Sequence, residues 1–287
     1  MKIGISGASG NLGRAIVREL EARGVGEQVV AISRSPETLM VEGETRRGDY
    51  DHPDTLAAAY AGIDRLVLIP SVDLRPGVRG RQIKAAVDAA FAAGVPHIVF
   101  LSAAGTRRAE VPAMGEAYWT GEQHLIRTAS TWTIIRMNYY AESMAEEILS
   151  SLDQGVLVGF GDERVGYVSR EDLATAVARA VLGEGHAGAI YNATGPALIG
   201  GPERAEIASE VLGKSLGYVV IGPEQLRAGM EPLGLPSHVL DAIVEIKTQF
   251  VEGYFDILTN DVERLSGRAL TPFRDVLAKI AAHAAQN

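Results

Sequence analysis

The chain has 287 residues, of which 47% are hydrophobic and 22% charged, and it contains no cysteine. This composition is typical of a globular protein and excludes a disulfide scaffold, a thiolate zinc site and cysteine-based catalysis. The 36 acidic residues outnumber the 27 basic ones, which gives a net charge of −9, and no dense cluster of lysine and arginine offers a surface for nucleic acid.

The N-terminus, MKIGISGASG, begins directly with a strand pattern. A secretory signal would instead place a charged segment before an apolar stretch. No run reaches the roughly eighteen apolar residues that a membrane-spanning helix requires. We therefore expect a cytoplasmic protein without a membrane partner.

Short apolar runs alternate with amphipathic helical patterns through the first half of the chain. The predicted strands are residues 2–6, 28–33, 45–49, 65–70, 97–102 and 131–136. The predicted helices are residues 11–23, 53–60, 79–93 and 115–129, and several end at a glycine that suits a left-handed cap. This alternation is typical of βαβ units, so the fold class is α/β, with a doubly wound parallel Rossmann sheet of six strands.

Beyond about residue 150 the rhythm changes. Short strands at 156–159, 164–168, 189–193 and 217–221 lie between helices at 170–182, 203–212, 237–252 and 272–284. We predict a Rossmann domain over residues 1–150 and a smaller α/β substrate domain over residues 151–287, with residues of about 160–195 returning to the main sheet. Apolar helical stripes at 144–149 and 239–250 suit core packing or the contact of a homodimer.

Residues 7–13 read GASGNLG, directly after the first predicted strand and at the start of the first helix. In that context a glycine triplet is typical of an NAD(P)-binding loop. Gly7 permits the tight turn, Gly10 lets backbone N–H groups approach a pyrophosphate, and Gly13 permits close packing of helix on strand. The predicted cofactor contacts here are Gly7, Ala8, Ser9, Gly10, Asn11 and Leu12. The alternative is a glycine-rich turn without a ligand.

The end of the second strand distinguishes the two nicotinamide cofactors. An NAD enzyme usually carries an acidic residue there for the ribose 2′-hydroxyl, whereas this chain has Ser33, Arg34 and Ser35. The arginine and the hydroxyl groups suit a 2′-phosphate, so NADP(H) is the predicted cofactor and NAD(H) the second choice. The alternative is that Arg34 is an ordinary solvated loop cation.

Further cofactor contacts are predicted where later strands end. Asp49 and Tyr50 follow the third strand, where the carboxylate could meet an adenine amino group or cap its own turn. Pro70 and Ser71 end the fourth strand, and Ser102 ends the fifth. All of them lie at the carboxyl edge of the predicted sheet, where ligands bind in this fold.

Four segments together resemble one family: GASGNLG, ISRSP at 32–36, GDY at 48–50 and TIIRMNYYAES at 133–143. They resemble the NmrA-like branch of the atypical short-chain dehydrogenases, and within it the bacterial NAD(P)H:quinone and triphenylmethane reductase group. The similarity continues through YVSREDLATAVARAVL at 167–182 and LTPF at 270–273. The resemblance implies an NADPH-binding Rossmann domain with a small C-terminal substrate domain. It places residues 7–12 and Arg34 at the pyrophosphate and 2′-phosphate, and Asn138 to Glu142 and Arg170 near the nicotinamide half.

Ordinary members of the wider superfamily use a tyrosine and a lysine four residues apart, and the lysine cation lowers the pKa of the phenol that transfers a proton. This chain departs from the pattern, because Met114 falls at the tyrosine position and Tyr118 at the lysine position. No lysine occurs between Lys84 and Lys214. Tyr118 is the remaining catalytic candidate, as proton donor or substrate contact, although a tyrosine beside Trp119 also suits packing.

The substrate-binding prediction combines Tyr118 with Asn138, Tyr139 and Tyr140, which follow the sixth strand. The tyrosines could stack on a flat substrate or line the nicotinamide pocket, and the alternative is packing between the two halves. The histidines show no metal-ligand spacing, so no metal is expected.

The missing dyad suits an acceptor whose reduced form is already delocalised, because hydride delivery can then suffice. We predict an NADPH-dependent reductase of quinones or related planar conjugated acceptors that works by direct hydride transfer. Two alternatives stay open: an oxidoreductase that tailors an aromatic polyketide, and a non-catalytic NAD(P)-binding redox sensor that regulates a protein partner.

Overall fold

The computed structural model describes residues 1–109 and 114–286, and the chain divides into two compact units. Unit 1 comprises Met1–Arg136, Arg170–Tyr191 and Leu265–Gly267. Unit 2 comprises Met137–Ser169, Asn192–Arg264 and Arg268–Asn287. The chain therefore passes between the units several times, and each unit is assembled from segments that are distant in sequence.

Seven strands form the main sheet. Their order is β3 (Glu44–Arg47), β2 (Val29–Ser33), β1 (Ile3–Ser6), β4 (Arg65–Leu68), β5 (His97–Ala103), β6 (Trp132–Met137) and β9 (Ile190–Ala193). The register is parallel, and Ile5 lies opposite both Ala31 of β2 and Val67 of β4. The sheet confirms the predicted doubly wound α/β fold, and its seventh strand, β9, lies in the segment of about residues 160–195 that the sequence predicts to return to the sheet.

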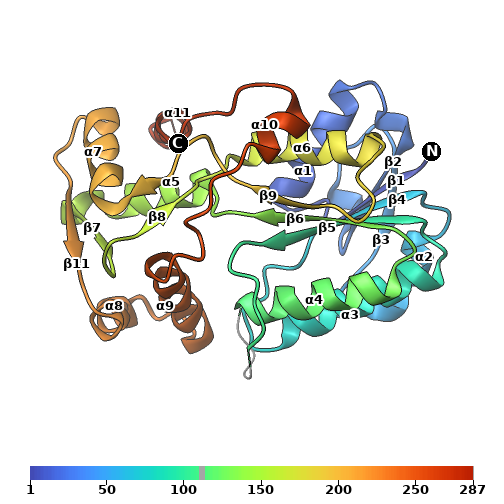
Figure 1. The fold of residues 1–287 in the computed structure, drawn as a ribbon, viewed down its shortest axis with the longest axis horizontal. Helices are drawn as coiled ribbons and strands as arrows, with labels where there is room; N and C mark the ends of the chain where they lie inside the picture. Colours follow the sequence, from blue (N-terminus) through green and yellow to red (C-terminus); the bar gives the residue numbers. More distant parts are fainter. Residues whose placement is uncertain (110–113, 287) are drawn as a thin grey trace. The chain divides into compact units, whose positions relative to one another are not determined.

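Helices cover both faces of this sheet (Figure 1). On one face α1 (Asn11–Ala22) packs with α6 (Arg170–Leu182), and on the other lie α2 (Leu56–Tyr60), α3 (Val78–Ala92) and α4 (Met114–Thr128). Because both faces are covered, every residue of the central strands β1 and β2 is buried, whereas the edge strand β3 is polar and mostly exposed. The strand order reverses between β1 and β4, and in folds of this class ligands bind outside the carboxyl ends of the strands at such a point.

Unit 2 is mostly helical. Its helices are α5 (Ala141–Ser150), α7 (Gly201–Leu212), α8 (Pro223–Met230), α9 (Ser237–Val251) and α11 (Phe273–Ala284), and α10 (Asp261–Ser266) leads out of it. Two small sheets pair β7 (Val156–Gly159) with β11 (Gly217–Val220), and β8 (Arg164–Val165) with β10 (Ile199–Gly200). α8 is absent from the predicted elements because Leu226 is its single buried residue, which leaves no helical period to read.

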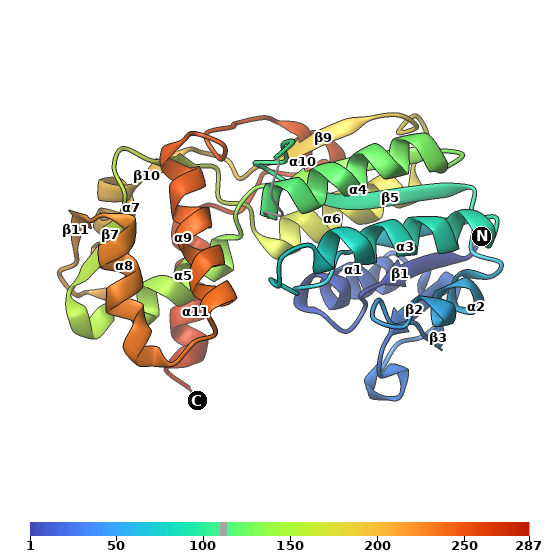
Figure 2. The same cartoon turned by 90° about the horizontal axis from the view of Figure 1, so that it is seen from below.

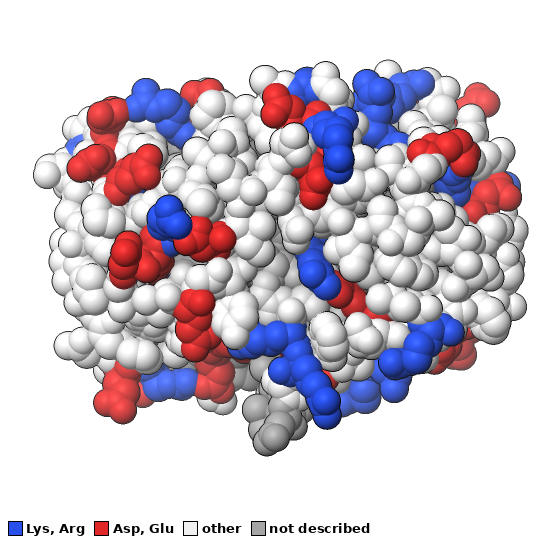
Figure 3. Space-filling model, in the orientation of Figure 1, with Lys and Arg blue, Asp and Glu red and all other residues white. Residues whose placement is uncertain are grey.

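Charged side chains of both signs occur on the face of each unit drawn in Figure 3, and broad uncharged areas separate them. Among the helices formed by the described residues, none is long and apolar enough to cross a membrane.

Candidate functional site

The glycine loop joins β1 to α1 and is bonded to the neighbouring strand. The backbone N–H groups of Gly7 and Ala8 both donate to the carbonyl oxygen of Ile32, each at 3.1 Å. Gly10 caps α1 without a side chain, and the first turn of this helix contains no acidic residue. The first N–H groups of α1 are therefore left without a capping side chain at the positive end of the helix dipole, an arrangement that binds an anion such as a pyrophosphate.

The three positions of the loop differ in whether the fold requires a glycine there. Gly7 has a φ of +90°, which favours glycine, and a Cβ on Gly13 would lie 2.2 Å from the carbonyl oxygen of Gly7. A Cβ on Gly10 would meet only that same oxygen, at an ordinary 3.5 Å. The fold thus requires Gly7 and Gly13, whereas no steric contact with the described residues requires a glycine at position 10. Among the predicted contacts, Ser9, Gly10 and Asn11 are exposed and Ala8 and Leu12 are buried.

Arg34 follows β2 with an exposed side chain. Among the described residues it has no hydrogen bond or ion pair, although its charge acts on Asp49. Ser33 is buried, and its hydroxyl accepts a hydrogen bond from the N–H of Ser35 at 3.2 Å. Arg34 lies two residues beyond Ile32, to whose carbonyl the glycine loop is bonded, so its guanidinium is available for a phosphate near that loop.

Asp49 closes its own turn after β3. Its Oδ1 accepts from the N–H of Asp51 at 3.0 Å, and its Oδ2 pairs with Nδ1 of His52 at 3.0 Å. Burial alone would raise the pKa of the Asp49 carboxyl, but these two hydrogen bonds and the nearby Arg34 cation lower it. The capping role is therefore present in the fold, and an adenine contact of the same carboxylate stays a prediction.

Tyr50 belongs to a buried hydroxyl network at the carboxyl ends of β1 and β4. Its Oη donates to the carbonyl oxygen of Ile69 at 2.8 Å and lies 2.8 Å from Oγ of Ser6. Ser6 also lies 3.0 Å from Oη of Tyr60. Burial, together with the neighbouring Tyr60, raises the pKa of Tyr50 well above its ordinary value. The phenol thus fixes the two strand ends, while its ring remains partly exposed.

The loop after β4 is held by α3. Ser71 donates its hydroxyl hydrogen bond to Oε1 of Gln82, and Nε2 of Gln82 donates to Oδ1 of Asp51 at 2.7 Å. Gln82 thereby ties the loops that follow β3 and β4 to one helix. Pro70 and Ser71 are both half-buried in this loop. Sequence reasoning missed Gln82, because a single polar residue in a helical pattern carries no sign of its partners.

Ser102 lies at the end of β5 and is completely buried. Its hydroxyl donates to Oε1 of Glu122 at 2.5 Å, and Arg136 donates to both carboxylate oxygens of Glu122, at 2.9 and 2.7 Å. This bidentate hydrogen bonding raises the pKa of Arg136. The hydroxyl predicted to meet the cofactor is therefore committed to a buried carboxylate inside unit 1, and a cofactor contact of Ser102 stays a prediction.

Tyr118 sits on α4 with 9% of its surface exposed. Its ring belongs to the buried apolar cluster that includes Ile83, Phe100 and Leu125, and Met114 packs against the same cluster. Within the described part of the chain, the Tyr118 hydroxyl makes no hydrogen bond. The ring therefore serves packing, and the hydroxyl stays available to a ligand.

Three predicted substrate residues belong to unit 2 and pack within it. Asn138 donates from Nδ2 to the carbonyl oxygen of Phe255 at 3.0 Å and accepts at Oδ1 from the N–H of Tyr139 at 2.7 Å. The ring of Tyr139 meets that of Phe250 edge to face, with centroids 5.1 Å apart. Tyr140 donates to Sδ of Met137. The nitrogen and the oxygen of the Asn138 side chain thus both bond within unit 2. The substrate-binding roles of Asn138, Tyr139 and Tyr140 stay predictions.

Arg170 is the first residue of α6, in unit 1, and is half-buried. Its side chain therefore starts from the positive end of this helix. The nicotinamide contact that the resemblance assigns to it stays a prediction.

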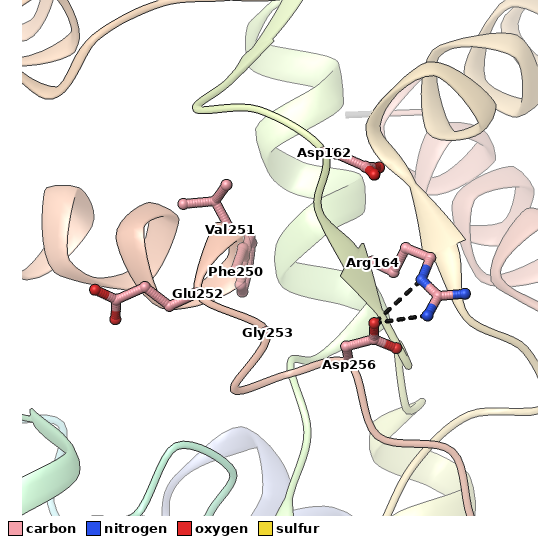
Figure 4. A pocket seen from close by; sticks show the side chains of 7 residues that line it. All are labelled: Asp162, Arg164, Phe250, Val251, Glu252, Gly253 and Asp256. Carbon is pink, nitrogen blue, oxygen red and sulfur yellow. Dashed lines mark hydrogen bonds and ion pairs between the residues drawn. The ribbon is translucent and has the colours of Figure 1, made fainter.

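A hollow of about 380 Å³ opens in unit 2 (Figure 4). The residues that line it are Asp162, Arg164, Phe250, Val251, Glu252, Gly253 and Asp256. Arg164 pairs with Asp256 at 2.7 Å, and the Phe250 ring lies at the apolar side of the hollow. The sequence gives no sign of this hollow, because its lining comes from two segments about 90 residues apart that only the fold brings together.

Comparisons with known proteins agree with this geometry. A family model described as NAD(P)H-binding matches residues 7–183. Quinone oxidoreductase 2 of Escherichia coli (strain K12) is 29% identical over 248 residues, which cover 85% of this chain and 86% of that protein.

Two solved structures superpose over nearly the whole chain. The NADPH-dependent quinone oxidoreductase QOR2 of Escherichia coli, complexed with NADPH, has a TM-score of 0.90 at 25% identity and covers 97% of this chain and 99% of its own. The triphenylmethane reductase of Citrobacter sp., complexed with NADP(H), has a TM-score of 0.88 at 27% identity and covers 98% of this chain and 100% of its own. These similarities confirm the resemblance to the quinone and triphenylmethane reductase group.

Proposed function

The chain belongs to the NAD(P)H-binding family, and from this premise we propose that it is an NADPH-dependent reductase of quinones and related planar conjugated acceptors. The observation that carries the proposal is the start of α1, which has no capping side chain and where no contact with the described residues requires a glycine at position 10. The full-length likeness to an NADPH-bound quinone oxidoreductase supports it. The chain uses NADPH as its reductant, with the pyrophosphate at the glycine loop.

The preference for NADPH rests on the end of β2. Arg34 is exposed and, within the described residues, has no carboxylate partner, so it meets an incoming 2′-phosphate without first breaking an ion pair. The position that carries an acidic residue in NAD enzymes therefore carries a cation here. NADH lacks the phosphate and gains nothing from this contact.

Reduction of a quinone to a hydroquinone consumes two electrons and two protons. Bound NADPH supplies a hydride, which carries both electrons and one proton. Tyr118 supplies the second proton from its hydroxyl, and solvent restores it. Since the acceptor delocalises the incoming charge, the chain can work without a lysine beside the phenol, and its main task is to orient the two reactants.

The proposal is tested by titrating the protein with NADPH and NADH, then adding menadione, a polycyclic quinone, a cationic triphenylmethane dye and a sulfonated naphthoquinone. We expect tighter binding of NADPH and acceptor-dependent loss of reduced nicotinamide. Tight NADPH binding without turnover of any acceptor would overturn the reductase and favour a sensor of the cofactor.

A cytoplasmic location and a homodimer complete the proposed description, but the dimer would have to use a surface other than the stripes that the sequence suggested for it. The apolar stripes predicted for a dimer contact lie on α5 and α9, where Met144, Ile148, Leu240 and Phe250 are buried within the chain itself. Few side chains of these stripes are thus left for a partner subunit. Light scattering of the purified protein measures the oligomeric state directly, and a monomer would contradict the dimer.

A further inference from the structure

Arg79 is a charged side chain that the fold buries beside Tyr118. It lies in the first turn of α3 and is 8% exposed. Its Nε donates to the carbonyl oxygen of Ser71 at 2.9 Å. Its guanidinium carbon lies 5.3 Å from the centre of the Tyr118 ring. That distance is within the range of a cation–π interaction, which is strengthened when the pair is shielded from water.

α3 and α4 approach closely because each helix presents a glycine to the other. A Cβ on Gly80 would meet Ala117 at 3.7 Å, and a Cβ on Gly121 would meet Ile83 at 2.6 Å. Figure 2 shows the two helices side by side. Arg79 and Tyr118 each lie one residue from the Gly80 and Ala117 contact, so the close approach brings the guanidinium onto the ring.

We propose that Arg79 is the positioning residue for Tyr118, and that it takes over from α3 the cation that a lysine on α4 supplies in ordinary members of the superfamily. The inference rests on the proposed function, in which Tyr118 delivers a proton. Because the guanidinium sits on the ring and not on the hydroxyl, it restrains the phenol without occupying its oxygen. Within the described residues the Tyr118 oxygen has no other partner, so the acceptor's oxygen becomes its hydrogen-bond partner.

Arg79 also joins Tyr118 to the loop after β4, which carries the predicted cofactor contacts Pro70 and Ser71. The loop has a second support, because the Ser71 hydroxyl bonds to Gln82. Loss of the Arg79 side chain should therefore release the phenol more than the loop. This predicts a larger effect on kcat than on the KM for NADPH.

The test is a double-mutant cycle with Arg79→Met and Tyr118→Phe, assayed with NADPH and menadione. Arg79→Met should lower kcat about tenfold and change the KM for NADPH less than about threefold, since misorientation of a proton donor costs rate and not cofactor affinity. In the Tyr118→Phe background Arg79→Met should have little further effect on kcat. Arg79→Lys, which keeps the cation, should recover part of the rate.

Arg81→Met is the matched control, because Arg81 lies on the same helix with an exposed side chain. It should leave kcat and KM unchanged. Multiplicative effects of Arg79→Met and Tyr118→Phe would overturn the proposal, because they would show that Arg79 does not act through Tyr118. An equal loss of rate in Arg81→Met would also overturn it.

A second measurement does not depend on turnover. The protein has nine tyrosines, so in protein labelled with 3-fluorotyrosine the ¹⁹F resonance of Tyr118 is identified by its loss in Tyr118→Phe. That resonance should shift and broaden in Arg79→Met and stay in place in Arg81→Met. An unmoved resonance overturns the positioning role. A moved resonance in a protein that reduces no acceptor leaves the contact standing and refutes the proposed reductase instead.

Discussion

The two ends of the main sheet use polar groups in opposite ways. At the amino end, Arg65 donates to the carbonyl oxygens of Val181 and Gly183, at 2.7 and 2.6 Å, and to Glu184 at 2.6 Å. Beside it, His97 meets the hydroxyl of Thr133 at 2.9 Å. The polar groups of this end bond to one another and join the starts of β4, β5 and β6 to the turn after α6.

At the carboxyl end several polar groups are left over. Gly10 caps α1 without a side chain, and within the described residues Arg34 and the hydroxyl of Tyr118 have no hydrogen-bond partner. Other side chains of the same end, such as Ser102 and Asp49, are fully engaged. Whether a polar group has a partner within the chain thus distinguishes residues that stabilise the fold from residues available to a ligand. Both kinds occur at the carboxyl end.

The largest expected effect contrasts Gly13 with Gly10. Gly13→Ala places a Cβ 2.2 Å from the carbonyl oxygen of Gly7, where the backbone must shift, and we expect a loss of about 3 kcal/mol or more in the free energy of unfolding. Gly10→Ala meets only an ordinary contact at 3.5 Å and should lose no more than about 1 kcal/mol, because alanine is a poorer N-cap for α1 than glycine. The variant should instead lower the affinity for NADPH, because the added methyl group lies where the pyrophosphate approaches.

Urea unfolding and NADPH titration of both variants measure this contrast. Alanine is a sufficient test at position 13, because its Cβ already meets the backbone. Unchanged NADPH binding in Gly10→Ala would show that the ligand does not pass close to this residue, and the loop would then be a turn without a ligand.

Arg65→Met is expected to act on stability alone. The substitution leaves the carbonyl oxygens of Val181 and Gly183 without their charged donor, which should cost about 2 kcal/mol in the free energy of unfolding. The Kd for NADPH should not change, because Arg65 lies at the amino end of its strand. Arg18→Met, which removes an exposed arginine from α1, is the control and should change neither quantity. A weaker NADPH affinity in Arg65→Met would contradict the separation of the two ends.

Arg34→Asp is expected to change cofactor affinity and not stability, the reverse of Arg65→Met. Loss of a charged contact to the 2′-phosphate should raise the Kd for NADPH by about tenfold to a hundredfold. The Kd for NADH and the free energy of unfolding should remain nearly unchanged. Arg18→Asp makes the same change of net charge on α1 and should weaken both cofactors slightly and equally. Equal weakening of NADPH and NADH by Arg34→Asp would show that Arg34 does not read the 2′-phosphate.

The sequence predicted the parallel sheet and the glycine loop because both depend on local patterns. Apolar runs as in β2 and the spacing of Gly7, Gly10 and Gly13 can be read within a dozen residues. The contacts of Arg79 could not be predicted in this way, because its partners Ser71 and Tyr118 reach it only through the packing of α3 on α4. The same holds for the hollow of unit 2 and for Ser102, whose hydroxyl turns to Glu122.

The smallest effect concerns the pH dependence of the amino end. Burial lowers the pKa of His97 from its ordinary value of 6.5, and the charges of Arg65 and His186 lower it further, against the opposing charge of Glu184. Since Thr133 donates its hydroxyl hydrogen to the carbonyl oxygen of His186, it accepts from Nε2–H of neutral His97. Protonation of His97 adds a half-buried cation beside Arg65 and is disfavoured in the folded state.

The lowered pKa of His97 determines how the free energy of unfolding changes with pH. The unfolded chain binds a proton at His97 as the pH falls below the ordinary pKa, while the folded chain resists it, so the free energy of unfolding should be highest above that pKa and decrease as the pH falls through the lowered one. Urea unfolding of the wild type and His97→Asn across this window isolates the contribution, because the other histidines are common to both proteins. The variant should show a flatter dependence on pH. If the two curves stay parallel, His97 does not titrate differently in the folded and unfolded states, and the amino end owes its stability to Arg65 and its carbonyl partners alone.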